Sequence, residues 1–97
     1  LTFFFRAFSS SARARILSQL CESGRMAGCQ IVKEHPISRG AISQHLKILR
    51  DVGFVECEEK CPYTIYWVNS LVLNEARKLC IAFLEELIGI LKSLGSN

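Results

Sequence analysis

The chain has 97 residues, of which 49% are hydrophobic and 22% are charged, and its formal net charge is +3. This composition predicts a single folded domain and excludes an intrinsically disordered chain, which would have few hydrophobic residues and a large net charge. It also excludes a membrane span, because charged residues such as Glu75, Lys78 and Glu85 interrupt the most apolar stretch, residues 71–94.

The first half of the chain predicts a series of short helices. Residues 1–8 are apolar and aromatic and suit a short helix packed on another element. Serines 9–11 offer N-caps for a second helix over residues 12–22, which ends at Gly24. Its predicted apolar stripe consists of Ile16, Leu17, Leu20 and Cys21, with Arg13 and Gln19 pointing elsewhere.

Two further helices are predicted on either side of a tight turn. The first covers residues 26–34 and stops before Pro36, because the residue preceding a proline is pushed out of the helical region. Ser38 is the predicted N-cap of the second, over residues 39–51, whose apolar stripe is Ala41, Ile42, Leu46 and Leu49. Such a pair is a helix-turn-helix, in which the second helix enters the major groove of DNA.

The second half predicts a hairpin and a long helix. Residues 54–59 and 64–69 have the composition of strands and flank the turn at residues 60–63. The helix predicted over residues 71–94 is apolar over most of its surface. An apolar surface of that width predicts burial against another chain.

The motif SRGAISQHLKILRDVGFV, at residues 38–55, resembles the ArsR/SmtB family of winged-helix repressors. That family carries a Ser-x-x-x-(Val/Ile)-Ser-x-His-Leu-Lys-x-Leu run followed by Gly-Leu-Val across its recognition helix and into its wing. Residues 6–8 and 12–17 resemble the opening of the family, and Tyr66-Trp67 falls where its wing ends. The resemblance covers about residues 5–69.

This resemblance implies a mainly α fold with a small β-hairpin, a dimeric winged helix-turn-helix. The whole chain, residues 1–97, would then be one domain: residues 1–22 as N-terminal helices, 26–51 as the helix-turn-helix, 54–69 as the wing and 71–94 as the dimerisation helix. The family resemblance further implies a homodimer that binds an inverted-repeat operator in double-stranded DNA and represses transcription until an inducer weakens the complex.

The candidate DNA-binding residues lie on the fourth helix and at the hairpin tip. Arginine suits guanine, glutamine suits adenine, and glycine allows close approach of the backbone. An ordinary solvated helix face is the alternative reading of these residues, and for the histidine a hydrogen bond in the core is the alternative. The candidates are Ser38, Arg39, Gly40, Ser43, Gln44, His45, Lys47 and Lys60.

Charge is unevenly distributed along the chain. Residues 1–50 carry eight Lys or Arg against two acids, hence +6, whereas residues 51–97 carry four against seven, hence −3. A nucleic-acid surface is therefore expected in the first half. Glu56, Glu58 and Glu59 stand where wings often carry basic residues, so the alternative function is a protein-interaction module with an acidic wing and no DNA binding.

The odd number of cysteines predicts no disulfide framework and suits a reducing cytoplasm. The short apolar start of the chain is also less than a secretory signal requires. Arsenic-sensing members of the resembled family bind the metalloid through several thiols in the third helix, where this chain has Cys29 alone. Zinc-sensing members use histidines in the last helix, and the last predicted helix of this chain has none. A third hypothesis, added to the DNA-binding one, is a response to a thiophilic metal or metalloid or to a redox signal, with thiol candidates Cys29, Cys57, Cys61 and Cys80.

No nucleophile–base pair, paired carboxylates or phosphate-binding glycine loop has a supporting strand–turn–helix context, so we expect no enzymatic activity.

Overall fold

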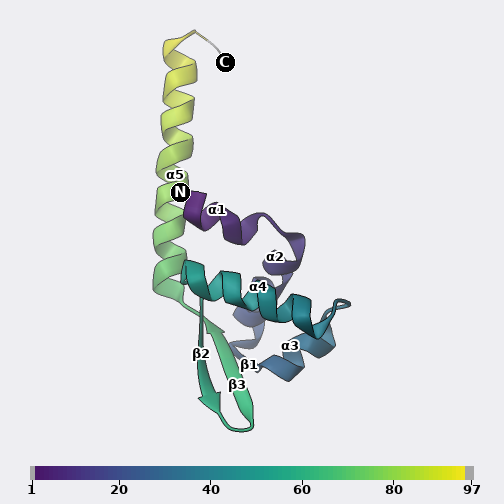
Figure 1. The fold of residues 1–97 in the computed structure, drawn as a ribbon. Helices are drawn as coiled ribbons and strands as arrows, with labels where there is room; N and C mark the ends of the chain where they lie inside the picture. Colours follow the sequence, from purple (N-terminus) through teal and green to yellow (C-terminus); the bar gives the residue numbers. More distant parts are fainter. Residues whose placement is uncertain (1, 96–97) are drawn as a thin grey trace.

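A computed structural model describes residues 2–95 of the chain, which form five helices and a three-stranded antiparallel sheet (Figure 1). The helix α1 (Thr2–Phe8) packs beside α2 (Ser11–Ser23) and α4 (Arg39–Val52), and the sheet lies at the opposite end of α2 from α1. This confirms the mainly α winged helix-turn-helix architecture. Residue 1 of the predicted first helix lies outside the described residues.

The N-terminus of α2 is defined by Ser10, whose hydroxyl accepts a hydrogen bond from the Arg13 backbone N–H, and the helix ends at Gly24, whose φ is +84°. Two expectations for this helix are wrong. Cys21 is exposed, whereas Arg13 is only 8% exposed. Arg13 precedes Ile16 by three residues, so helical geometry places both on the buried side. The Arg13 guanidinium donates hydrogen bonds to the Arg6 carbonyl and the Ser9 hydroxyl, which make its burial tolerable.

The predicted helix over residues 26–34 is shorter than expected. Residues Arg25–Ala27 instead form the strand β1, and the helix α3 spans Gly28–Glu34. In β1, Met26 pairs with Tyr66 and Ala27 with Ile65 of β3, so the backbone of β1 finds hydrogen-bonding partners in the sheet. The side chains of Met26 and Ala27 are buried. The side chain of Gln30 accepts a hydrogen bond from the Ala27 N–H, so the helix starts immediately after it.

The hairpin consists of β2 (Val55–Lys60) and β3 (Tyr63–Val68), with Cys61 and Pro62 at its turn. The strand order β1-β3-β2 corrects the prediction of a two-stranded hairpin, because β1 adds to the free edge of β3. Strand pairing also extends one residue further towards the tip on each side than predicted, because Lys60 pairs with Tyr63.

The predicted N-cap of α4 is confirmed. The Ser38 hydroxyl accepts a hydrogen bond from the Ala41 N–H at 3.1 Å, and Gly53 ends the helix with a left-handed φ of +92°. The predicted apolar stripe is buried at Ile42, Leu46 and Leu49, whereas Ala41 is half-buried. These side chains and Phe54 anchor α4 in the core, which fixes the direction of its opposite face.

Phe54 is fully buried where the N-terminal helices meet the end of α4. The ring of Phe4 stacks on it, with 5.5 Å between centroids, and the ring of Phe8 lies 5.4 Å away. This aromatic contact explains how a short, apolar α1 is held in place.

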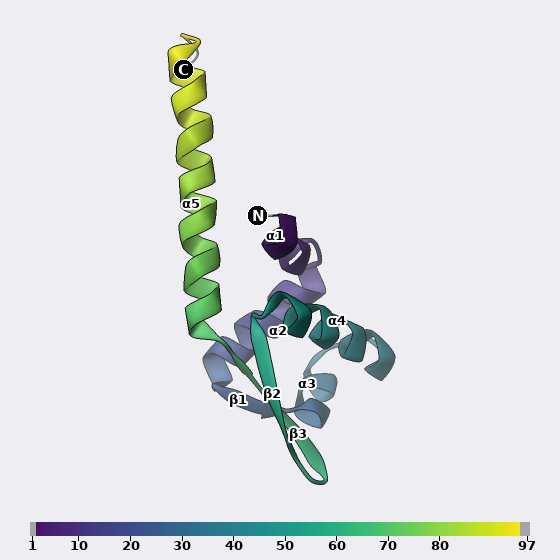
Figure 2. The ribbon, with the colours of Figure 1, turned by 60° about the vertical axis from the view of Figure 1, so that its left-hand side comes forward.

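The long helix α5 (Ser70–Ser93) leaves the sheet and extends past α1 beyond all other elements, as both views show (Figures 1 and 2). The side chain of Asn69 caps it by accepting hydrogen bonds from the N–H groups of Leu71 and Val72. Among the described residues of α5, only Ala76 is fully buried. The exposed large apolar side chains of α5 are Leu71, Leu79, Ile81, Phe83, Leu84, Leu87, Ile88, Ile90, Leu91 and Leu94, the last of which follows the helix directly.

Candidate nucleic-acid interface

The face of α4 opposite the core carries the predicted DNA-binding side chains. Arg39, Ser43, Gln44 and Lys47 are all exposed, and so are Ser38 and Gly40 at the start of the helix. They share one face because the buried residues of α4 recur at helical spacing. Seven of the eight predicted residues thus belong to α4 or its N-cap, and six of these seven are exposed, with hydrogen-bonding groups that suit base edges and phosphates.

The backbone at Gly40 is open to solvent. A Cβ atom built at this position would meet only the hydroxyl of Ser38, at 4.0 Å. The first turn of α4 thus presents no side chain at this point, which permits close approach of a nucleic-acid backbone.

His45 differs from the other candidates on α4, because it is half-buried. Its Nδ1 lies 3.1 Å from Nη1 of Arg13, so it makes the interior hydrogen bond that was the alternative reading of this residue. Burial, and secondarily the charge of Arg13, lower the pKa of His45 below its ordinary value. The imidazole is therefore neutral at neutral pH.

One of the wing glutamates is hydrogen-bonded within the sheet. The Trp67 indole N–H donates to a Glu56 carboxylate oxygen at 3.1 Å, and the Arg25 guanidinium lies 4.1 Å from the centre of the Trp67 ring. The three residues are cross-strand neighbours in β1, β3 and β2. Lys60 is exposed at the end of β2 beside the turn, as predicted.

A cavity of about 230 Å³ separates the start of α4 from the wing. Arg39 and Ser43 line it from α4, Cys29 lines it from α3, and Tyr63 and Tyr66 line it from β3. Burial raises the pKa of Tyr66, with Cys57 adding to the increase and Arg50 opposing it, so this phenol keeps its proton at neutral pH.

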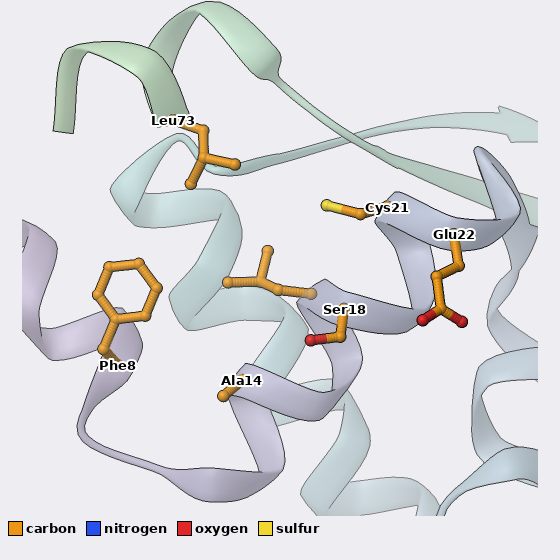
Figure 3. Close-up of a pocket in the computed structure, with 7 residues that line it drawn as sticks. Phe8, Ala14, Ser18, Cys21, Glu22 and Leu73 are labelled. Atoms are coloured by element: carbon orange, nitrogen blue, oxygen red, sulfur yellow. The ribbon is translucent and has the colours of Figure 1, made fainter. Parts of the chain in front are cut away.

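A second hollow, of about 440 Å³, is mainly apolar and lies between α2, the end of α1 and the start of α5 (Figure 3). Phe8 and Leu73 line opposite sides, and the Cys21 thiol points into the space between them. This hollow contains none of the predicted DNA-binding residues, and sequence reasoning did not identify it.

The cysteines do not assemble a metal site within the described part of one chain. All five are free, and no group of three or more His, Cys, Asp or Glu side chains in residues 2–95 is arranged to hold an ion. Of the thiol candidates, Cys29 and Cys61 are exposed, whereas Cys57 and Cys80 are partly buried. The three-thiol site that As(III) prefers is therefore not formed by these residues alone.

Sequence reasoning missed the contribution of Arg13, which was expected to point away from the core. Its position three residues before Ile16 was the signal that places it on the buried stripe of α2. The contact of Arg25 with Trp67 carried no such signal, because β1 was not expected.

Within residues 2–95, none of the helices combines the length and apolar content needed to cross a bilayer.

Known proteins similar to this chain are regulators of transcription. The sequence pattern described as "Bacterial regulatory protein, arsR family" matches residues 10–56, from the cap of α2 to the start of β2. An uncharacterized HTH-type transcriptional regulator of Methanocaldococcus jannaschii is 33% identical over 75 residues, which cover 77% of this chain and 84% of that protein. The arsenical resistance operon repressor of Bacillus subtilis is 28% identical over 81 residues, covering 81% of this chain and 77% of the repressor.

The fold is similar to that of a solved ArsR-like transcriptional regulator from Rhodococcus sp. RHA1, with a TM-score of 0.83 and 25% sequence identity. The alignment covers 98% of this chain and 86% of the Rhodococcus chain. The similarity therefore includes α5 and the part of the wing after residue 56, which lie outside the matched family pattern.

Proposed function

Because the chain belongs to the ArsR family of bacterial regulatory proteins, we propose that it is a sequence-specific DNA-binding transcriptional repressor that acts as a homodimer. The observation that carries this proposal is the exposed polar face of α4, which is held outward by a buried apolar stripe on the same helix. That arrangement suits a recognition helix in the major groove.

Each residue on this face has a proposed role. Gln44 and Arg39 read base edges, because their side chains can make paired hydrogen bonds to adenine and guanine. Lys47, Ser43 and Ser38 contact phosphates and set the register, and Gly40 lets the backbone come close. Lys60 contacts the DNA backbone from the wing. His45 has no proposed DNA contact, because its Nδ1 already has a partner in Arg13.

The apolar surface of α5 supports the homodimer. Leu84 is 56% exposed and Ile88 is 51% exposed, although both are large aliphatic side chains. A contiguous exposed apolar surface of this kind marks an interface. A second copy related by a two-fold axis would cover it and present two α4 helices to half-sites about 34 Å apart, which is one turn of B-DNA.

We propose one domain over residues 1–97, acting in the cytoplasm where the operator DNA is found. The alternative, a protein-interaction module without DNA binding, is less well supported, because family membership and the outward face of α4 favour DNA and Glu56 is engaged with Trp67. We propose no catalytic activity for this chain, because its relatives are named as regulators. Both a small inducer and a thiol or metal signal are candidates for the signal that relieves repression.

The test begins with selection of DNA fragments by the purified protein from a random pool, and we expect an inverted repeat to be enriched. In binding assays on that sequence, Gln44→Ala should cost about 1–3 kcal/mol and relax specificity at one base pair of each half-site. Lys47→Ala should weaken binding to all sequences alike and reduce the slope of log affinity against log salt by about 0.9 for each phosphate that the lysine would otherwise neutralise.

Lys92→Ala is the matched control, because this lysine is exposed on α5 far along the chain from α4. It should leave both affinity and salt slope unchanged. Enrichment of no sequence, together with equal and salt-independent binding to all DNA, would refute the proposal.

A further inference from the structure

The side chain of Arg13 joins three helices. From α2, its Nη2 donates hydrogen bonds to the Arg6 carbonyl at 3.0 Å, near the end of α1, and to the Ser9 hydroxyl at 2.9 Å. Its Nη1 lies 3.1 Å from Nδ1 of His45 in α4. A single side chain thus connects α1, α2 and the proposed recognition helix.

The surroundings of Arg13 make each of these bonds important. Arg13 is only 8% exposed, and its Nε is buried without a hydrogen-bond partner in the described part of the chain. The three acceptors are a carbonyl, a hydroxyl and an imidazole nitrogen, all of them uncharged. A buried cation that loses one of so few acceptors is left with a desolvation cost that nothing offsets.

The hydrogen bond also determines the state of His45. A guanidinium has donors only, so Nδ1 must be the acceptor and the proton of the neutral ring must be on Nε2. A doubly protonated imidazole has no acceptor at Nδ1 and would set two cations 3.1 Å apart. In the described residues, Arg13 from α2 is the charged group acting on His45, whereas α1 contributes the neutral Arg6 carbonyl through Arg13.

We infer that Arg13 and neutral His45 form a positioning link that sets the orientation of α4 relative to α1 and thereby controls operator affinity without contacting DNA. This inference rests on the proposed function. Loss of this link would let α4 shift relative to α1 and would misalign the two recognition helices of the proposed dimer.

The direction of the pH dependence distinguishes this role from a direct DNA contact. A histidine that touches phosphate binds more tightly when it gains a proton, because its positive charge then faces an anion. A histidine that must accept a hydrogen bond from Arg13 does the opposite. The chain has two histidines, so His35, whose Nε2 lies 2.7 Å from Oε1 of Gln19, supplies the matched control.

The experiment measures affinity for the selected operator by fluorescence anisotropy, at constant ionic strength, from about pH 7.5 down to the lowest pH at which the dimer stays folded, because the lowered pKa of His45 places its protonation below the ordinary histidine value of about 6.5. We expect wild type and His35→Gln to lose about 10-fold in affinity on acidification, the size of one charge-assisted hydrogen bond. His45→Asn should show no such loss, because the Asn oxygen can accept from Arg13 and does not titrate. Circular dichroism and light scattering at each pH verify that folded dimers are compared.

Arg13→Lys keeps the positive charge but places all its donors on one nitrogen, so it does not reproduce the fork in which Nη1 bonds His45 while Nη2 bonds the Arg6 carbonyl and the Ser9 hydroxyl. We expect this variant to fold and to bind the operator about 10-fold more weakly at neutral pH. Wild-type affinity in folded Arg13→Lys would overturn the inference.

Two further outcomes would overturn the inference. One is tighter or unchanged binding by wild type and His35→Gln at low pH, a readout that stands even if His45→Asn does not fold. The other is a pH profile of His45→Asn that follows wild type. Absence of operator binding at every pH would refute the proposed function and this inference together, whereas binding with a flat profile refutes the inference alone.

Discussion

Ser38 has two roles in the proposed repressor, as the cap of α4 and as a phosphate contact, and substitution can separate them. Its hydroxyl accepts the hydrogen bond from the Ala41 N–H at 3.1 Å, and no acidic residue occupies the first turn of α4 to compensate for its loss. Ser38→Ala should therefore lower the free energy of unfolding by about 1 kcal/mol. For a domain of this size, this corresponds to a decrease in Tm of roughly 4–8 °C.

Ser38→Asp should shift stability and DNA binding in opposite directions. A carboxylate keeps the capping acceptor and interacts favourably with the positive end of the helix dipole, by about 0.3–1 kcal/mol at low ionic strength. Stability should therefore equal or exceed that of wild type. Operator affinity should fall, because the new negative charge faces the phosphates, and the loss should diminish as salt is raised.

The assay combines thermal unfolding at one fixed protein concentration with operator binding at two salt concentrations, because the stability of a dimer depends on its concentration. Asn69→Asp is the matched control: it adds one negative charge at the N-cap of α5, where the side chain accepts from Leu71 and Val72 N–H groups. Operator binding by Ser38→Asp equal to that of Asn69→Asp would refute the placement of Ser38 at the DNA. Unchanged stability of Ser38→Ala would refute its role as a cap.

Four further predictions concern packing, assembly and pH. Leu49→Ala, at a fully buried position, should lower the free energy of unfolding by about 2–5 kcal/mol in urea denaturation, and a loss below about 1 kcal/mol would contradict the core assignment. Gly53→Ala should cost about 1–2 kcal/mol, because φ is +92° there; a neutral effect would mean that the helix end rearranges. Leu84→Glu should give a folded protein that is a monomer in size-exclusion chromatography with light scattering and that binds the operator weakly. A stable dimer would exclude this part of α5 from the interface. The pKa of His45 is lowered in the folded protein, so the contribution of His45 to stability is complete above the ordinary histidine pKa of about 6.5 and is lost as pH falls through the folded pKa. Between these two pKa values, wild type should lose more stability than His45→Asn.

The wing shows how strand pairing decides the contacts of a charged side chain. One of the three glutamates in β2, Glu56, accepts a hydrogen bond from Trp67, whose ring is covered by Arg25. Arg25 lies 31 residues before Glu56 in the sequence, and β1 brings it to the same cross-strand row. Contacts of this kind depend on strand pairing and could not be predicted from neighbouring residues.

Local sequence determined the elements whose signals are complete within a few residues. Ser38 and Gly53 delimit α4, and the spacing of Ile42, Leu46 and Leu49 orients its polar face, because caps and helical periodicity act over one or two turns. The hairpin and the long α5 were predicted for the same reason. The motif at residues 38–55 then identified the family.

Tertiary structure alone decided the features that join distant segments. Met26 and Ala27 form a strand because the edge of β3 is available to pair with them, which no local preference indicates. Arg13 is buried because Arg6, Ser9 and His45 converge on it from two other parts of the chain. Hydrogen-bond partners across 32 residues are set by packing, so the sequence presents the recognition helix while the folded chain determines what holds it in place.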